Sequence, residues 1–176
     1  IRLIKFFAII SFCLTTNAIA LIEIDITEGN REPLPIAISD FFYDEVDSLK
    51  LNEISNNLSD VVKADLERCG LFAPINEDAF IQKNSAMHLR PRFEDWRLIK
   101  SQALVTGKLK IVDEDKLRVE FRLWDTLAEK EIEAVVLITT LDNWRRISHM
   151  ISDKVYERLT GEKGYFDTRI LYVSES

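Results

Sequence analysis

His149 and Asp153 are the two residues whose types and spacing could do chemistry. They lie four residues apart in a segment with helical periodicity, so they would share one face of a helix. A carboxylate there could orient the imidazole, which could then act as a general base. No nucleophile or cofactor motif accompanies the pair, so we favour a surface or interface pair on an acidic helix over a small hydrolase.

Other catalytic and ligand-binding motifs are missing from the sequence. The five glycines are scattered and form no phosphate-binding loop, and no GxSxG elbow is present. A zinc site would require His88, His149, Cys69 and a carboxylate to converge, which their spacing does not indicate. We therefore predict no catalytic residues, no metal and no cofactor, and His88 is expected to be solvated.

The first twenty residues have the pattern of a secretory signal peptide. Arg2 and Lys5 precede an apolar run from Phe6 to Leu14, and an A-x-A sequence ends at Ala20. The alternative, a membrane-spanning helix, needs about 20 apolar residues, and this run is shorter. We expect cleavage after Ala20, and hence export out of the cytoplasm.

The predicted mature chain is acidic. Two of the 23 basic residues and none of the 30 acidic residues lie in positions 1–20, which leaves a net charge of 21 − 30 = −9. Such a charge repels phosphate backbones and anionic lipids, so neither nucleic acid nor direct membrane insertion is expected. Cys69 is the one cysteine left, so no internal disulfide is predicted.

Alternating strands and two amphipathic helices organise the rest. Helices are predicted at 51–69 and 142–160, each followed by a glycine (Gly70 and Gly161), with a short helix at 93–100. Strands are predicted at 21–26, 34–38, 103–112, 116–124 and 132–140, the last three joined by antiparallel hairpins, and residues 73–92 are predicted as loop. The fold class is α/β: a two-layer sandwich with a mixed β-sheet of about five strands and two long helices packed on one face.

Some residues can be interpreted either as structural or as functional. Trp96, Trp124 and Trp144 could stack on a ligand, but core positions are favoured, as is packing for Cys69. Pro33 and Pro35 place the second strand's approach at an edge or outside the ladder. Glu23, Asp25 and Glu28 give the first strand an acidic face, either solvated or exposed to a partner strand.

Six stretches resemble the TolB family of periplasmic proteins in order and spacing. They are Ile24–Gly29, Pro35–Ile38 with Phe41, Asp65-Leu66 with Gly70 and Phe72, Trp96 with Ala103–Gly107, Trp144–Asp153 (WRRxxHxxxD) and Leu159–Val173 (LTG, then GxFxTRIxYV). Cys69 stands where the family usually has serine, and Lys100 and Gln102 replace its Gly and Asp. The family's β-propeller is absent from the chain.

The resemblance implies a TolB-like N-terminal α/β domain at 21–166 and the start of a linker toward a propeller at 167–176. It implies a periplasmic adaptor of the Tol–Pal system, linking inner-membrane TolA to the outer-membrane lipoprotein Pal for outer-membrane integrity and constriction during cell division. Pal binding would require a propeller supplied from elsewhere. A non-functional truncated remnant is the alternative.

The same resemblance places the contact with the C-terminal domain of TolA on the N-terminal strand. The implied contact residues are Ile22, Glu23, Ile24, Asp25, Ile26, Thr27 and Glu28.

Overall fold

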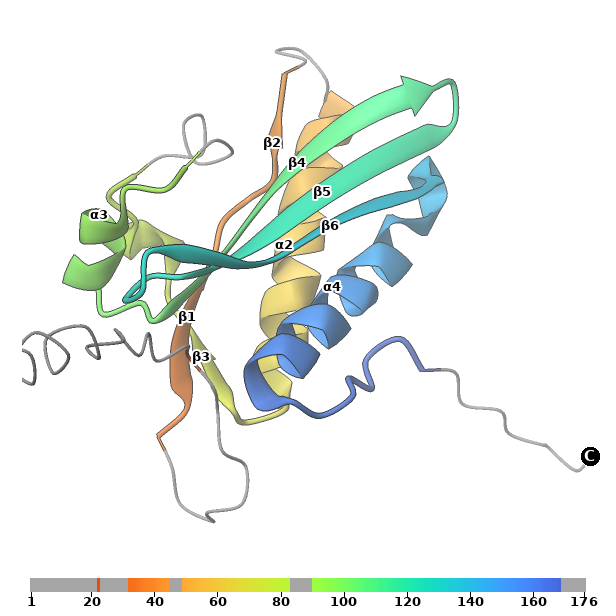
Figure 1. The fold of residues 1–176 in the computed structure, drawn as a ribbon. Coiled ribbons are helices and arrows are strands. Elements are labelled where there is room, and N and C mark those ends of the chain that lie inside the picture. The colour runs from red at the N-terminus through yellow and green to blue at the C-terminus, as the bar shows by residue number, and fades with distance from the viewer. Residues whose placement is uncertain (1–21, 23–31, 45–48, 83–89, 169–176) are drawn as a thin grey trace, which may run out of the picture.

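The computed structural model describes residues 22, 32–44, 49–82 and 90–168 (Figure 1). The predicted strand at 21–26 lies outside these residues except for Ile22, as do His88 and the predicted signal peptide. Within the described ranges, no helix is long and apolar enough to cross a membrane.

A mixed sheet forms one layer of the domain. Its strands run in the order β3 (Phe72–Pro74), β1 (Leu34–Ile38), β4 (Ala103–Asp113), β5 (Lys116–Asp125) and β6 (Lys130–Thr140), and β2 (Phe42–Tyr43) also pairs with β4. The strand β1 is parallel to β3 and β4, whereas β4, β5 and β6 are antiparallel neighbours. The predicted hairpins are therefore confirmed.

Two long helices form the second layer, on one face of the sheet (Figure 1). They are α2 (Leu49–Arg68) and α4 (Trp144–Thr160), the latter entered through the short 3-10 helix η3 (Leu141–Asn143). Gly70 and Gly161 follow them with φ of 76° and 75°, a left-handed conformation that glycine adopts without steric cost. The predicted two-layer α/β class is confirmed.

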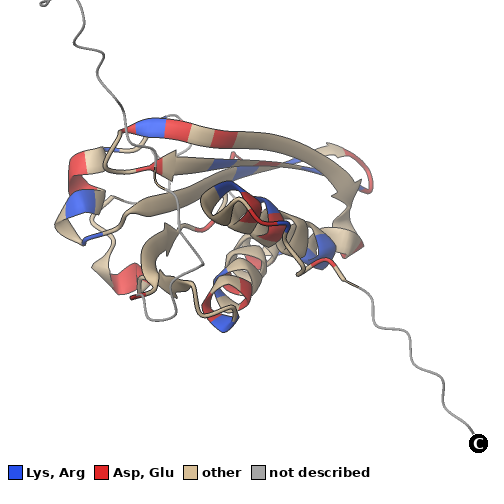
Figure 2. Cartoon of the chain, turned by 60° about the horizontal axis from the view of Figure 1, so that its bottom comes forward, with Lys and Arg blue, Asp and Glu red and all other residues tan. Residues whose placement is uncertain are grey.

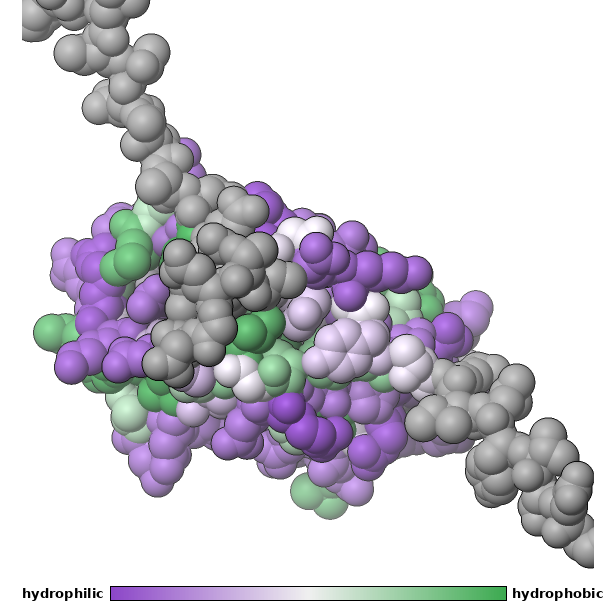
Figure 3. Space-filling model, turned by 90° about the horizontal axis from the view of Figure 1, so that it is seen from below, coloured by the Kyte–Doolittle hydropathy of each residue, from purple (hydrophilic) through white to green (hydrophobic). Residues whose placement is uncertain are grey.

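The main core lies between this face and the two helices. It includes the alternate β5 residues that the sequence places on one face, and the stripes of α2 and α4. Their members include Leu117, Val119, Phe121, Leu123, Leu51, Leu58, Val62, Ile147, Ile151, Val155 and Leu159. Seen from below, the surface is mainly hydrophilic with small hydrophobic areas among the polar side chains (Figure 3), as expected for a domain with a buried core.

A second, smaller core lies on the other face of the sheet, under the short helix α3 (Phe93–Leu98). Trp96 and Trp124 are buried there with Phe93 and Leu104, and Trp124 donates a hydrogen bond to Thr106 Oγ1 at 2.9 Å. Trp144 is partly buried against the main core. The core interpretation of the three tryptophans is confirmed.

The position of β1 decides between the two alternatives predicted from the prolines: the edge alternative is wrong, and on the side of β4 the position outside the ladder is confirmed. Despite Pro35, β1 lies between β3 and β4, inside the sheet. Its pairing with β4 starts only at Ile36 and Ala103, one residue after the proline, while the Pro35 carbonyl accepts from Gln102 N–H at 2.9 Å. The backbone nitrogen of Pro35 therefore points toward residues that precede β4. No hydrogen bond between β1 and β4 is lost because proline lacks an N–H.

Three short elements escaped sequence analysis. The strand β3 and the 3-10 helix η1 (Glu77–Ala79) fall at or within the predicted loop at 73–92, and β2 follows β1 closely. Two or three residues are too few for a period to show. The predicted caps Asp47 and Ser48 lie outside the described residues.

Gly107 in β4 makes room for a core aromatic ring. A Cβ at this position would overlap the Phe41 ring and would lie 2.7 Å from the carbonyl oxygen of Glu120 on the neighbouring strand. Phe41 is 1% exposed and cannot move outward without opening the core. The glycine of the Ala103–Gly107 stretch therefore has a packing role.

We predict that Gly107→Ala lowers the free energy of unfolding by about 1–3 kcal/mol, the usual cost of overfilling a packed core. Urea denaturation followed by circular dichroism measures this change. Lys110→Ala, at an exposed position of the same strand, is the control and should stay within about 0.5 kcal/mol of the parent. Equal stability of the two variants would contradict the packing role.

Candidate functional site

Ile22 is the described residue of the predicted partner-binding segment, and it is held on the domain. Its backbone N–H donates to Asp125 Oδ2 at 3.1 Å, across 103 positions of sequence, and its side chain packs, partly buried, against the main core. The other proposed contact residues, Glu23 to Glu28, lie outside the described residues. Their role in binding stays a prediction.

The anchoring residue Asp125 is 1% exposed and sits where β5 turns toward β6. Its Oδ1 accepts from the N–H groups of Leu127 and Ala128 at 2.9 and 2.8 Å, so the same carboxylate shapes the turn and holds Ile22. The next residue, Thr126, is fully buried and donates its hydroxyl to the backbone before β4. Ile22, the first of the proposed contact residues, is thus held by a carboxylate that is itself fixed by the turn.

His149 and Asp153 each bond to other residues instead of to each other. His149 Nδ1 lies 2.7 Å from Asp65 Oδ2, on α2, and Ser152 Oγ lies 3.0 Å from the same oxygen. Asp65 is 3% exposed, so these contacts join α2 to α4 inside the helical layer. Ser, His and Asp are all present, but serine and histidine both face the carboxylate, and nothing orients the hydroxyl toward the imidazole for nucleophilic attack.

Asp153 instead holds the chain after α4. Its Oδ1 accepts from Phe166 N–H at 2.7 Å and its Oδ2 from Asp167 N–H at 3.1 Å. Arg146 adds an ion pair to Asp167 at 3.2 Å, and Gly164 passes so close that a Cβ there would lie 2.5 Å from Asp153 Cα. The hypothesis of a base and its orienting carboxylate is wrong, because each member has another structural partner.

A cavity of about 260 Å³ lies beside this cluster. Its lining includes Asp65, Arg68, Cys69, His149, Tyr165 and Phe166. Burial raises the pKa of the Cys69 thiol, and its Sγ donates to Leu66 O at 3.0 Å, which favours the packing role predicted for it. Among the described residues, no three His, Cys, Asp or Glu side chains gather to hold a metal ion.

Sequence reasoning missed the roles of Asp65 and Asp125. Asp65 falls on the apolar stripe of α2 beside Val62 and Leu66, and a carboxylate on a buried helix face signals an internal partner. Asp125 ends a strand and is followed by a tight turn, where an aspartate often accepts from the backbone two residues on. Neither pattern reveals which distant residue supplies the partner.

The fold and these clusters define a two-layer α/β domain whose polar groups join its two long helices and hold Ile22 and residues 166–167 in place. The chain belongs to the TolB amino-terminal domain family, whose model matches residues 22–132.

Two of the known proteins that are similar to this chain are proteins named TolB. It is 53% identical, over 98% of its length, to the Tol-Pal system protein TolB of Pelagibacter ubique, and it spans 40% of the length of that relative. The crystal structure of TolB from Acinetobacter baumannii superposes with a TM-score of 0.62 at 25% identity, over 84% of this chain and 33% of that one.

We predict that Asp65→Ala lowers the free energy of unfolding by about 1–3 kcal/mol, because His149 loses its acceptor between the two helices and Ser152 keeps only the Ser148 carbonyl of its own helix. Asp65→Asn keeps one acceptor oxygen and should cost less. Asp60→Ala, at a position 72% exposed on the same helix, is the matched control. Thermal and urea unfolding measure all three, and a loss no greater than that of the control would refute the structural role.

We predict that Asp153→Ala loosens residues 164–167 without unfolding the domain, because two backbone N–H groups lose their acceptor. Limited trypsin digestion should then cut after Lys163 about fivefold faster, the change expected from about 1 kcal/mol in local opening. Glu157→Ala, one turn later on the same helix, should leave the cleavage rate unchanged. An unchanged rate in Asp153→Ala would show that Arg146 alone holds the segment.

Proposed function

We propose that this chain is the partner-binding amino-terminal module of a Tol–Pal system adaptor in the periplasm. The observation that carries the proposal is the anchoring of Ile22 by Asp125, directly ahead of the acidic residues Glu23, Asp25 and Glu28. Family membership and the 53% identity to a Tol-Pal system protein support it.

The proposed partner is the C-terminal domain of TolA, bound through residues 22–28. An alternating apolar and acidic segment can add to the edge of a partner's sheet by backbone hydrogen bonds. Its three carboxylates would favour a basic partner surface and accelerate association. Because Asp125 fixes the segment at Ile22, less chain entropy would be lost on binding than for a free tail.

The boundaries we propose follow the same assignment. Residues 1–20 are the cleaved signal peptide, 21–166 the binding module and 167–176 the start of a linker. In this proposal, contact with Pal requires the remaining part of a full-length relative, since this chain spans 40% of one. The whole adaptor would serve outer-membrane integrity, cell division and protein transport across the envelope.

An enzymatic alternative is not favoured, because His149 and Asp153 take part in separate structural contacts. A remnant that folds but binds nothing is the competing interpretation, and a binding experiment separates the two.

We predict that calorimetric titration of residues 21–176 with the C-terminal domain of TolA gives micromolar-range binding, about −8 kcal/mol. A version starting at Arg31 should keep its fold by circular dichroism and lose binding. No heat from either folded version would mean that the module does not bind TolA by itself.

A second experiment tests how much the acidic side chains contribute to the affinity for TolA. Neutralising the segment with Glu23→Gln, Asp25→Asn and Glu28→Gln should weaken binding about tenfold, at about 0.5 kcal/mol for each charge pair with the partner. Asp113→Asn, Glu114→Gln and Asp115→Asn remove the same charge from the exposed β4–β5 turn and should leave the affinity unchanged. Equal weakening by both sets would indicate a long-range effect of net charge instead of a contact.

A further inference from the structure

The strand β6 is at the end of the sheet order and pairs with β5 only, within the described part of the chain. It has 11 residues, longer than most edge strands. Long exposed edges are templates for strand addition, and natural proteins protect them with charges, prolines or bulges. A part of the β6 edge that lacks such protection is therefore a candidate for pairing with another strand.

The first part of the edge is protected. A register shift falls opposite Leu123 and Trp124, and Arg158 of α4 donates its Nε–H to Ile132 O at 2.8 Å. Lys130, Glu131 and Glu133 add charge to the same end, where Figure 2 shows the only coloured residues of this strand.

The second part lacks these features. Ala134–Thr140 (AVVLITT) contains no charge, proline or glycine, and Val136 and Ile138 are 50% and 64% exposed. Such a segment has the composition of strands that pair with one another. The change from protected to unprotected edge within one strand marks 134–140 as an interaction surface.

The direction of the backbone groups follows from one hydrogen bond. Leu141 N–H donates to Asp115 O at 3.1 Å, so residue 141 faces β5. Alternation along an antiparallel strand then turns Thr139, Leu137 and Val135 toward β5, and the N–H and C=O groups of the even residues outward. These are Ala134, Val136, Ile138 and Thr140, and no described residue hydrogen-bonds to their backbone groups.

We propose that residues 134–140 pair antiparallel with the same residues of a second copy of this chain, with the two-fold axis at Leu137. In this register Val136 faces Ile138 of the second copy, and Ala134 faces Thr140. These even-numbered residues form hydrogen-bonded pairs, so both outward groups of all four residues are satisfied. The inference does not rest on the proposed binding of TolA.

The positions of the charged residues and the register favour a second copy of this chain as the partner of β6. In this register Glu133 lies beyond Thr140 of the second copy, so no charge opposes another and none is buried. Shifting the axis to Val136 would bring Thr140 against Ile132, whose carbonyl Arg158 already occupies. The register centred on Leu137 therefore pairs all four outward residues of the uncharged run without using Ile132.

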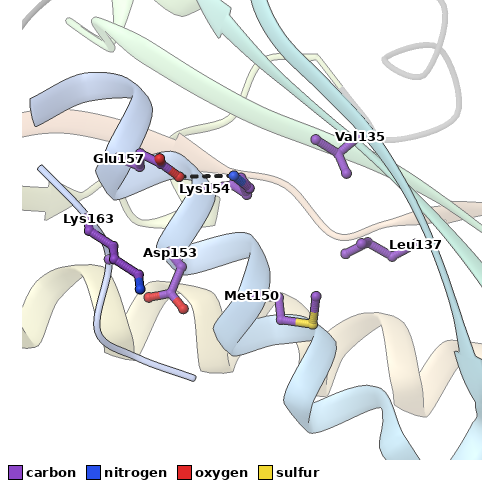
Figure 4. A pocket seen from close by; sticks show the side chains of 8 residues that line it. Val135, Leu137, Met150, Asp153, Lys154, Glu157 and Lys163 are labelled. Atoms are coloured by element: carbon purple, nitrogen blue, oxygen red, sulfur yellow. Dashed lines mark hydrogen bonds and ion pairs between the residues drawn. The ribbon is translucent and has the colours of Figure 1, made fainter. Parts of the chain in front are cut away.

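The helix side of β6 adds an apolar contact. Val135 and Leu137 point toward Met150 of α4 across an open cavity of about 220 Å³, rimmed by Asp153, Lys154 and Glu157 (Figure 4). The two-fold axis brings Leu137 of both copies together beside these cavities. On the opposite face it brings Val136 and Ile138 of each copy into contact, which removes exposed apolar surface from water.

Sedimentation velocity of the purified full chain, from micromolar to submillimolar concentration, tests the proposal. We expect the mass to rise from one copy toward two. Val136→Lys should weaken the dimer at least about tenfold, because an ammonium beside Ile138 has no partner. Val112→Lys, at a 45% exposed valine at the end of β4, is the matched control and should leave the association unchanged.

The register has a separate test by charge pairing. Val136→Lys combined with Ile138→Glu should restore the dimer, because the lysine of one copy then faces the glutamate of the other. Val136→Lys with Ile138→Lys should stay a monomer. Thermal melting confirms that every variant is folded, which is expected at exposed positions. A single-copy mass throughout, a dimer that resists Val136→Lys, or no rescue by the charge pair would overturn the proposal.

Discussion

Alternate residues of β4 and β5 bury their side chains against α2 and α4, with those of β6 packed partly buried beside them, and the other parts of the domain follow from that contact. Because the strand period is two, burying one set of residues turns the other set to the opposite face. The helices have one apolar stripe each, so they lie side by side and cover the sheet from one side. Phe41 and Gly107 show how closely this layer is packed.

Three carboxylates join elements of this domain to one another. Asp65 is buried between the two helices. Hydrogen bonds with the Ser152 hydroxyl and the His149 ring offset the free-energy cost of removing its carboxylate from water. Asp125 and Asp153 work in the same way at the two ends of the domain, where each accepts backbone N–H groups from an adjoining segment. A carboxylate can accept several hydrogen bonds at once, which suits it to fixing a chain end.

The domain has two proposed binding surfaces. One is the acidic segment that follows Ile22 in the sequence, and the other is the edge of β6. Both would use backbone hydrogen bonds to a strand, one to a basic partner and one to a second copy. They differ in what selects the partner: charge at the first, and an uncharged self-complementary run at the second.

The sequence by itself determined the two helical stripes with their glycine ends, the alternation of β5 and the α/β class, because each depends on periodicity among neighbours along the chain. The family resemblance drawn from its motifs is confirmed too. Tertiary structure alone decided that β1 lies inside the sheet despite Pro35, and that β2 and β3 pair at all. It also gave His149 the partner Asp65, 84 positions away, in place of Asp153, four positions away. A side chain's partner depends on which surfaces meet when the helices pack on the sheet, and spacing along one helix carries no information about that.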